Sequence, residues 1–421
     1  MRLMVPYQIA YSPLSAIITL YILELHGSVI DVAYALTLSQ LVIIPSSIFW
    51  GEIVEKYHRR RILINLSFLG LAVSLVGLYF SSTILEVILL YGFLSFIVTA
   101  NVTPFNLLIM ENEPKGRWAA EFSRLQMFSG LGTIVSLAIA SVLAYAVNIR
   151  ILILALAPFA LLAMVFTVSL IEPKTLRLKR GMITTLRAFR TRLFSHHLYL
   201  LHMRNRSFAR RLGYGAGVAK AGYFKMLLIA VFVYYLATYL FNTPYPAGLK
   251  AGGLSNFQIF LIILIANTAS TAVFFSLGVF SLKLKRARAI EEALLTRGSG
   301  YILMAVSFVL LTGTALAGLN AIVYMITSGV AYALFYTSMN TIVFSAIGSR
   351  NKSYRLGVYS GVTGLGGLVG SFLSGYLSFY VGYWFTFALA GLLIILCAYI
   401  FIRASRIRNE GLKTSWTART E

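Results

Sequence analysis

The stretch GEIVEKYHRRR, residues 51–61, lies between two long apolar runs and decides the fold. It holds two glutamates and four basic residues in one short connector. A looser copy, GVFSLKLKRAR at residues 278–288, also begins with a glycine that closes an apolar run, and Gly278 precedes Arg286 by the same interval that separates Gly51 from Arg59. A charged connector that recurs once in each half of an apolar chain predicts a duplicated membrane protein.

The composition supports a membrane protein. Of the 421 residues, 59% are hydrophobic and 12% are charged, and a soluble domain carries about twice that charged fraction. Because lipid offers no hydrogen bonds to the backbone, so apolar a chain must cross the bilayer as helices. We therefore predict an all-α integral membrane protein with twelve spanning helices, at residues 4–25, 29–50, 62–80, 84–110, 125–147, 149–171, 223–242, 256–279, 299–317, 320–346, 357–380 and 383–402.

The distribution of positive charge predicts the orientation. The net charge is +23, and 33 of the 36 Lys and Arg residues lie in alternate connectors or at the termini. Basic connectors remain on the cytoplasmic side, so we expect both termini and the central loop in the cytoplasm of a multi-pass cell-membrane protein. The same distribution makes the bilayer, rather than nucleic acid, the expected partner.

The predicted organisation is two six-helix bundles, residues 1–171 and 223–403, joined by a basic linker at 172–222 and followed by a cytoplasmic tail at 404–421. The linker is basic and intermittently apolar. It is either an amphipathic segment that contacts anionic lipid headgroups or a solvated linker whose charges fix the topology.

A second internal echo supports the duplication. Residues 111–132 and 349–370 both leave a helix, cross a short charged loop and enter the next helix through glycines. Arg117 precedes Gly132 by the same interval that separates Arg355 from Gly370. Parallel six-helix repeats are one signature of transporters, in which the solute path lies between the halves.

The segment 51–61 resembles the signature loop between helices 2 and 3 of the major facilitator superfamily. That signature reads Gly, three residues, Asp, Arg or Lys, any residue, Gly, and then basic residues. Glu55 replaces the usual Asp and His58 replaces the second Gly, whereas the other positions match. The resemblance extends over the chain through helix count, orientation and the degenerate second copy. It implies a secondary active or facilitative transporter that moves a small solute by alternating access.

The connector also predicts a gate. Gly51 is expected to end helix 2 tightly and to admit a close neighbour, and Glu55 can pair with a nearby arginine and face the positive end of another helix. The resemblance implies that this acid faces the start of helix 11 and holds the halves together on the cytoplasmic side. The alternative is that the charges fix topology alone. The second copy has Leu282 at the acid position, so any counterpart there would be Glu291 or Glu292. The gating residues that we predict are Gly51, Glu55, Lys56, Arg59, Arg60, Arg117 and Arg355.

Carboxylates that could carry protons are scarce. None of the 13 acids lies at the centre of a predicted span, and Glu24 and Asp31 are the best candidates for coupling. Their alternative role is that of interfacial charges. Proton-coupled drug exporters of the resembled family carry an arginine in helix 4 and a Gly-Pro signature in helix 5, and this sequence has neither at those places. Efflux of hydrophobic compounds is therefore the second choice.

Polar residues near mid-membrane mark the expected solute path. The resemblance implies that helices 1, 4, 7 and 10 line it, and an aromatic, amide-rich lining suits neutral or amphipathic solutes better than strong anions. The alternative for each residue is an interhelical hydrogen bond or an interfacial tyrosine. The candidates are Gln8, Tyr11, Gln40, Asn101, Tyr235, Tyr239, Asn267, Tyr332, Tyr336 and Asn340.

Two other function classes are rivals to transport. A membrane enzyme is disfavoured because the chain has one cysteine, one aspartate and no cluster typical of a catalytic or metal site. A sensor or scaffold that kept the fold is the other rival. We expect no cofactor and no metal, a small-molecule substrate as partner, and a monomer in the bilayer.

Overall fold

A computed structural model describes residues 3–57, 60–112, 118–167, 218–280, 286–347 and 352–417, and within these ranges the secondary structure is helical. Eleven stretches of these residues are long and apolar enough to cross a membrane. The remaining crossing, which is the first along the chain, is divided between two shorter helices, α1 (Met4–Tyr11) and α2 (Leu14–Glu24). The chain is thus a multi-pass membrane protein of twelve spans.

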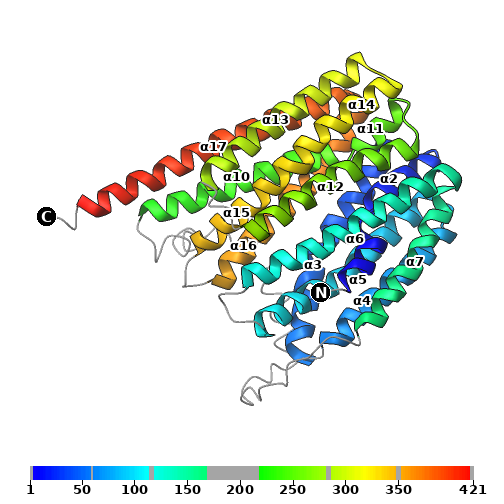
Figure 1. Ribbon diagram of the computed structural model, residues 1–421, viewed down its shortest axis with the longest axis horizontal. Coiled ribbons are helices and arrows are strands. Elements are labelled where there is room, and N and C mark those ends of the chain that lie inside the picture. The colour runs from blue at the N-terminus through cyan, green and yellow to red at the C-terminus, as the bar shows by residue number, and fades with distance from the viewer. Residues whose placement is uncertain are drawn as a thin grey trace.

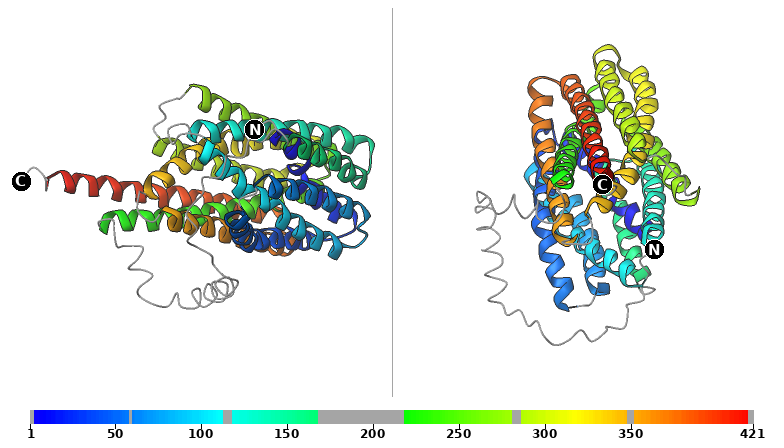
Figure 2. Two further views of the ribbon diagram at one scale, coloured as in Figure 1. Left: turned by 90° about the horizontal axis from the view of Figure 1, so that it is seen from below. Right: turned by 90° about the vertical axis from the view of Figure 1, so that its left-hand side faces the viewer.

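The two halves of the chain form two helical groups that lie side by side, with helices that run roughly along one axis (Figures 1 and 2). The N-terminal half continues from α2 with α3 (Val29–Tyr57), α4 (Arg60–Phe80), α5 (Ile84–Asn112), α6 (Trp118–Ala146) and α7 (Ile149–Phe166). The C-terminal half contains α10 (Val218–Asn242), α11 (Tyr245–Ala251), α12 (Asn256–Phe280), α13 (Arg286–Leu310), α14 (Gly313–Tyr324), the π-helix η4 (Met325–Ala331), α15 (Tyr332–Ile347), α16 (Lys352–Tyr380) and α17 (Tyr383–Thr417).

Two pairs of helices join the halves. Helix α3 packs along α16, and α6 packs along α12. The pairs are equivalent, because each joins the second crossing of one half to the fifth crossing of the other. The interface therefore follows the internal repeat that the sequence predicts.

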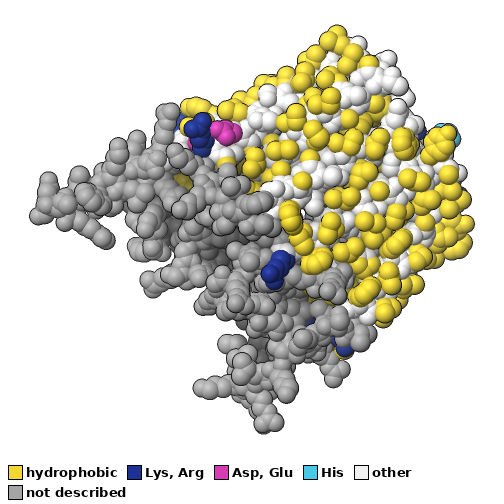
Figure 3. All heavy atoms as spheres, in the orientation of Figure 1, with side chains coloured by type: hydrophobic (Ala, Val, Ile, Leu, Met, Phe, Trp, Pro, Cys, Tyr) yellow, Lys and Arg dark blue, Asp and Glu magenta, His cyan; other side chains and the backbone are white. Residues whose placement is uncertain are grey.

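We name the two ends of the bundle by their connectors. The short-connector end carries the turns 25–28, 81–83, 147–148 and 381–382. The basic end is the opposite one, where α3 ends and α6 begins. Between the ends, large hydrophobic side chains such as Leu89, Val142 and Tyr399 are exposed, and Figure 3 shows hydrophobic side chains spread over one such face. A lipid-facing belt of this kind is what a bilayer requires.

Equivalent glycines let helices of each half approach closely. A Cβ at Gly132 in α6 would collide with the backbone of Val5 and the side chain of Gln8 in α1. A Cβ at Gly370 in α16 would collide with the backbone of Leu236 in α10. Small residues at such crossings allow backbones to come close together.

The structure corrects two predicted boundaries. Helix α3 continues through Gly51 to Tyr57, so this glycine does not end the helix, and a Cβ at position 51 would meet nothing within 4 Å among the residues described. The ninth crossing is α13, Arg286–Leu310, rather than 299–317. It ends before Gly313, whose φ of 57° breaks the helix.

Two other predicted segments fall near the edge of what the structure describes. Most of the linker 172–222, with its contact to anionic lipid, lies outside the described residues, although α10 already begins at Val218. In the predicted tail, α17 continues as helix to Thr417, and Figure 1 shows it extending past the neighbouring helices.

Candidate functional site

Two crossings are interrupted at corresponding places. Helix α1 stops at Tyr11 and α2 starts after Pro13, while α10 stops at Asn242 and α11 starts after Pro244. Pro13 precedes Pro244 by the same interval that separates Tyr11 from Asn242. Proline lacks the N–H that a helix interior needs, which explains both breaks. Interrupted apolar segments in corresponding positions of two repeats point to the solute site of a transporter.

Polar side chains from both halves meet at the level of these breaks. The Gln40 side chain in α3 donates a hydrogen bond of 3.1 Å to the Tyr239 hydroxyl in α10. Tyr11 lies near Tyr239 and stacks on Tyr7, with 5.6 Å between ring centroids. Gln8, one turn before Tyr11 on α1, packs against Gly132 of α6 within its own half. The structure thus brings Tyr11, Gln40 and Tyr239 into one neighbourhood between the halves.

A second group of predicted residues lies toward the basic end. The rings of Tyr332 and Tyr336 are 5.7 Å apart, and Phe274 of α12 meets both edge-on. Gln126 of α6 donates a 3.4 Å hydrogen bond to the Tyr336 hydroxyl, which again joins the halves. Tyr235 lies close to Tyr332 and Tyr336. Tyr239 is also near Tyr332, so the two groups are continuous.

The most unusual residue of the site is not among those predicted from the sequence. The predicted helix boundaries place Arg297 in a basic connector, but it lies near the middle of the span Ala287–Leu310 and is 1% exposed. Its Nε donates to the Tyr301 hydroxyl at 2.8 Å, and its guanidinium donates to the Tyr234 hydroxyl at 3.1 Å. The guanidinium carbon lies 5.3–5.5 Å from the ring centroids of Tyr234, Tyr301 and Tyr332. Such distances are typical of cation–π contacts.

No acidic side chain pairs with Arg297 among the residues the structure describes. Among the described residues, Arg297 is also the one charged side chain that is buried. Arg288 on the same helix behaves in the ordinary way, since it is exposed and pairs with Glu292 four residues later at 2.8 Å. That pair also shows that Glu292 is engaged within its own helix.

A signal for Arg297 does exist in the sequence. When the residues from Arg286 onward are read as one helix, Arg297 belongs to a stripe of buried residues at helical spacing. The stripe is formed by Ile290, Leu294, Arg297, Tyr301 and Met304. The charged residues before it masked this periodicity and moved the predicted start of the helix to residue 299. Two of them, Arg288 and Glu292, are exposed on the first turns of α13.

An irregular backbone segment lies directly beside the guanidinium. The crossing that contains Tyr332 is regular in α14, passes through the π-helix η4 and becomes α-helical again at Tyr332 itself. Helices with the wider π geometry are rare and frequently occur at functional sites. Of the three tyrosines around Arg297, Tyr332 therefore directly follows a segment of π geometry.

Other predicted path residues have local roles. Asn101 of α5 is buried and donates to the Ser67 hydroxyl of α4 at 3.0 Å, within the N-terminal half. Asn267 donates to the carbonyl of Ile263 in its own helix at 2.9 Å. The Asn101 contact is of the interhelical kind given above as the alternative, whereas the Asn267 contact lies within one helix. The side chains of Glu55, Lys56, Arg59, Arg117, Asn340 and Arg355 lie outside the described residues, and the gate stays a prediction.

The two coupling candidates differ in their surroundings. The Asp31 carboxylate accepts hydrogen bonds from the Ser28 backbone at 2.7 Å and hydroxyl at 2.8 Å, and the Asp31 N–H faces that hydroxyl at 3.4 Å. This reciprocal pattern is a capping box at the start of α3. Glu24 instead accepts a 3.3 Å hydrogen bond from Asn256, which itself accepts one from Lys250. It thus links the halves at the short-connector end.

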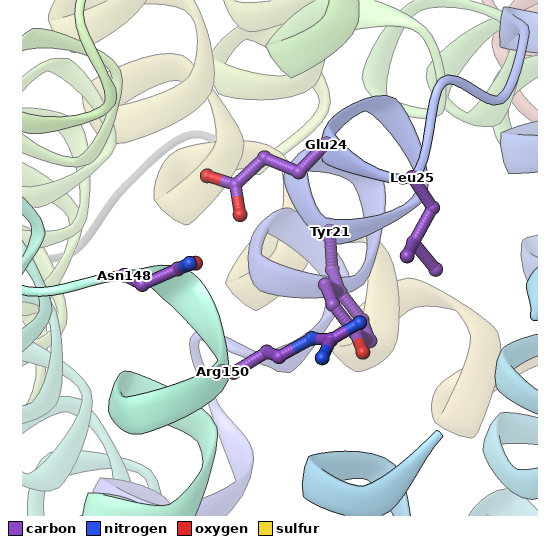
Figure 4. Close-up of a pocket in the computed structure, with 5 residues that line it drawn as sticks. All are labelled: Tyr21, Glu24, Leu25, Asn148 and Arg150. Carbon is purple, nitrogen blue, oxygen red and sulfur yellow. The ribbon is translucent and has the colours of Figure 1, made fainter. Parts of the chain in front are cut away.

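A cavity of about 330 Å³ opens beside Glu24 at this end. It is lined by Tyr21, Glu24, Leu25, Asn148 and Arg150, all from the N-terminal half. Figure 4 shows Arg150 extending toward Tyr21, and its guanidinium carbon lies 5.7 Å from the centroid of the Tyr21 ring. The Glu24 carboxylate points away from both side chains. Because it lies at a helix end, this cavity is separate from the mid-membrane groups. Among the described residues, no three His, Cys, Asp or Glu side chains come together as a metal site.

The fold and these inter-half contacts define a duplicated twelve-helix membrane protein. A model of the Major Facilitator Superfamily matches residues 4–353, and the chain belongs to that family. No curated protein matches the sequence significantly.

Solved transporters share the fold at low sequence identity. A POT family transporter in complex with 5-aminolevulinic acid has a TM-score of 0.67 at 14% identity, with 96% of this chain and 95% of that chain covered. The nucleoside transporter NupG has a TM-score of 0.66 at 13% identity, covering 96% and 98%. The xylose transporter XylE from E. coli, in a partially occluded inward open conformation, has a TM-score of 0.67 at 12% identity, covering 96% and 97%.

Proposed function

We propose that the protein carries a small solute across the membrane by alternating access, as a secondary active or facilitative transporter. The observation that carries the proposal is the pair of interrupted crossings at Pro13 and Pro244, with Gln40 bonded to Tyr239 between them. A site between two halves that rock against each other can open to either side in turn. Family membership supports this reading, and solved structures of the same fold include a peptide transporter, a nucleoside transporter and a xylose transporter.

The contacts at the short-connector end indicate where the halves must separate. The Tyr34 hydroxyl of α3 lies 2.6 Å from the Tyr376 hydroxyl of α16, and the backbone at Gly375 faces Ala33. Opening of this end would have to break these contacts. Transport in either direction uses the same step, so efflux of hydrophobic compounds is the alternative within this mechanism.

A reversible lock tests the mechanism. In a Cys397→Ser background, Ala33→Cys and Gly375→Cys would bring two β-carbons closer than the roughly 3.8 Å of a relaxed disulfide, so α3 and α16 must part slightly to accommodate the bond. We expect uptake into proteoliposomes, screened with labelled sugars, nucleosides, peptides and organic acids, to stop on oxidation and to return on reduction. The single variants Ala33→Cys and Gly375→Cys are the controls, and the second one measures the effect of the added Cβ alone. Equal uptake by the crosslinked and reduced protein, or no uptake of any solute by well-folded protein, would contradict the proposal.

We also propose that the charged connector at the basic end acts as a latch, in which Glu55 faces the start of α16. The motif match at residues 51–61 supports this role. Glu55→Gln should then increase the labelling of cysteine probes placed at the basic end. Unchanged labelling would contradict the latch, and the charges would then serve only to fix the topology.

A further inference from the structure

We propose that Arg297 binds the negative charge of the transported solute, and that this solute is a small organic monoanion with an apolar or aromatic body. The inference rests on the proposed transport function and names the class of substrate. It replaces the expectation of a neutral or amphipathic solute, which followed from an aromatic, amide-rich lining in which Arg297 had no part.

Burial of Arg297 without a counter-charge is the first observation. Transfer of a guanidinium into the membrane interior is expensive, and ionisable residues there usually line substrate or ion pathways. Arg297 is 1% exposed and lies at mid-span, and no carboxylate pairs with it among the residues described. Hydroxyls and ring faces stabilise the cation, but they leave its positive charge uncompensated. A bound anion would supply the missing charge.

The hydrogen-bonding capacity of the guanidinium is the second observation. Arginine has five N–H donors in a planar fork that matches a carboxylate. Two hydrogen bonds, to Tyr301 and Tyr234, are present in the part of the chain that the structure describes. Donors therefore remain for a carboxylate, and hydrogen bonds between two charged groups are the strong ones.

The surroundings indicate one negative charge rather than two. The other basic side chains described in the C-terminal half are exposed, namely Lys225, Lys250, Arg288 and Arg403. A single buried cation can neutralise a monoanion, whereas a dianion would leave excess charge in a low-dielectric site. The partly buried rings of Tyr235, Tyr332, Tyr336 and Phe274 adjoin Arg297 through Tyr332 and offer an apolar contact for the rest of the solute.

The π-helix provides access to the guanidinium. Tyr332 covers Arg297 in this structure and is the first residue after η4. Because a π-helix places more residues in each turn than an α-helix, conversion of η4 to α geometry would rotate Tyr332 relative to α14. Such a rotation would uncover the charge for a solute entering between the halves.

Binding of matched acids and amides to the purified full chain tests the proposal. Acetate, lactate, benzoate and phenylacetate are compared with their amides at equal ionic strength by thermal shift. We expect at least one carboxylate, and not its amide, to raise the Tm in a saturable way. Arg297→Gln should weaken that binding about tenfold or more, Arg297→Lys should weaken it less, and Arg288→Gln on the same helix should bind as the wild type does.

The outcomes separate the inference from the transport function. Equal carboxylate binding by wild type and Arg297→Gln, or no saturable stabilisation by any carboxylate, would overturn the proposal. If Arg297→Gln does not fold, the comparison of Arg297→Lys with wild type decides in the same way. Uptake of a neutral solute without carboxylate binding would support the transport function and contradict the anion site. Carboxylate binding that needs Arg297, with no flux of any solute, would support the anion site and contradict the transport function.

Discussion

The two halves of the molecule share a frame and differ in what they bury. Both contain a crossing broken at a proline and a glycine that admits a neighbouring backbone, at corresponding places. The described part of the N-terminal half buries neutral groups, such as the hydrogen-bonded pairs Asn101–Ser67 and Ser39–Ser95. The C-terminal half buries the guanidinium of Arg297 among tyrosines, beside a π-helix.

The difference shows which features belong to the fold and which to the solute. Neutral polar pairs between helices satisfy each other and add to packing. A buried unpaired charge opposes stability, and rules of folding are most often broken at functional sites. We therefore assign the frame to both halves and the recognition of solute mainly to the C-terminal half.

The largest expected effect contrasts a charged hydrogen bond with a neutral one. Tyr234→Phe removes an acceptor of the buried guanidinium and should lower stability by about 1.5–3 kcal/mol. Tyr21→Phe in the other half removes a neutral bond to the Ser81 carbonyl and should cost about 0.5–1.5 kcal/mol. Thermal unfolding in detergent measures both. A smaller loss for Tyr234→Phe than for Tyr21→Phe would mean that Arg297 does not depend on this hydroxyl.

The second prediction concerns the feature that the halves share. Gly132→Ala and Gly370→Ala each force a Cβ onto the backbone of a neighbouring helix and should cost about 1–3 kcal/mol. Gly361→Ala on α16 meets nothing within 4 Å among the described residues and should be neutral or slightly stabilising. Melting temperatures of the three variants test this. A lower melting temperature for only one of Gly132→Ala and Gly370→Ala would contradict the equivalence of the two packing sites.

The smallest expected effect separates the two acids at the short-connector end. Asp31→Asn weakens a helix cap and should cost about 1 kcal/mol or less, with no change in the pH dependence of uptake. Glu24, which links the halves through Asn256, remains the candidate for coupling. Uptake measured across a range of pH for Asp31→Asn and Glu24→Gln decides between them. A lost pH response in Asp31→Asn would return that residue to the coupling role.

Much of the fold could be predicted from the sequence. Apolar runs of bilayer length indicated the twelve crossings, and the motif at residues 51–61 indicated the family, which the match over residues 4–353 confirmed. These features depend on local composition. The ninth crossing was misplaced because charges that are exposed at a helix end, such as Arg288, look like a connector when each residue is read without its neighbours.

The site was harder to predict because it depends on contacts between distant segments. Tyr239, Tyr332 and Gln40 were named as path residues, and the structure brings them into one region. Arg297 was missed because its tyrosine partners come from α10 and α15 as well as from its own helix. The break at Pro244 was also missed, since its correspondence to Pro13 becomes visible only when the two halves are compared.

Chemical labelling at Tyr336 tests the central claim most directly, without knowledge of the solute. In a Cys397→Ser background, Tyr336→Cys is labelled with an anionic and a cationic methanethiosulfonate reagent, with and without Arg297→Gln. We predict that the introduced thiol reacts, that the anionic reagent is favoured when Arg297 is present, and that this preference falls about tenfold when Arg297 is removed, since a nearby charge acts strongly in a low-dielectric site. No reaction, or the same preference with and without Arg297, would contradict the account.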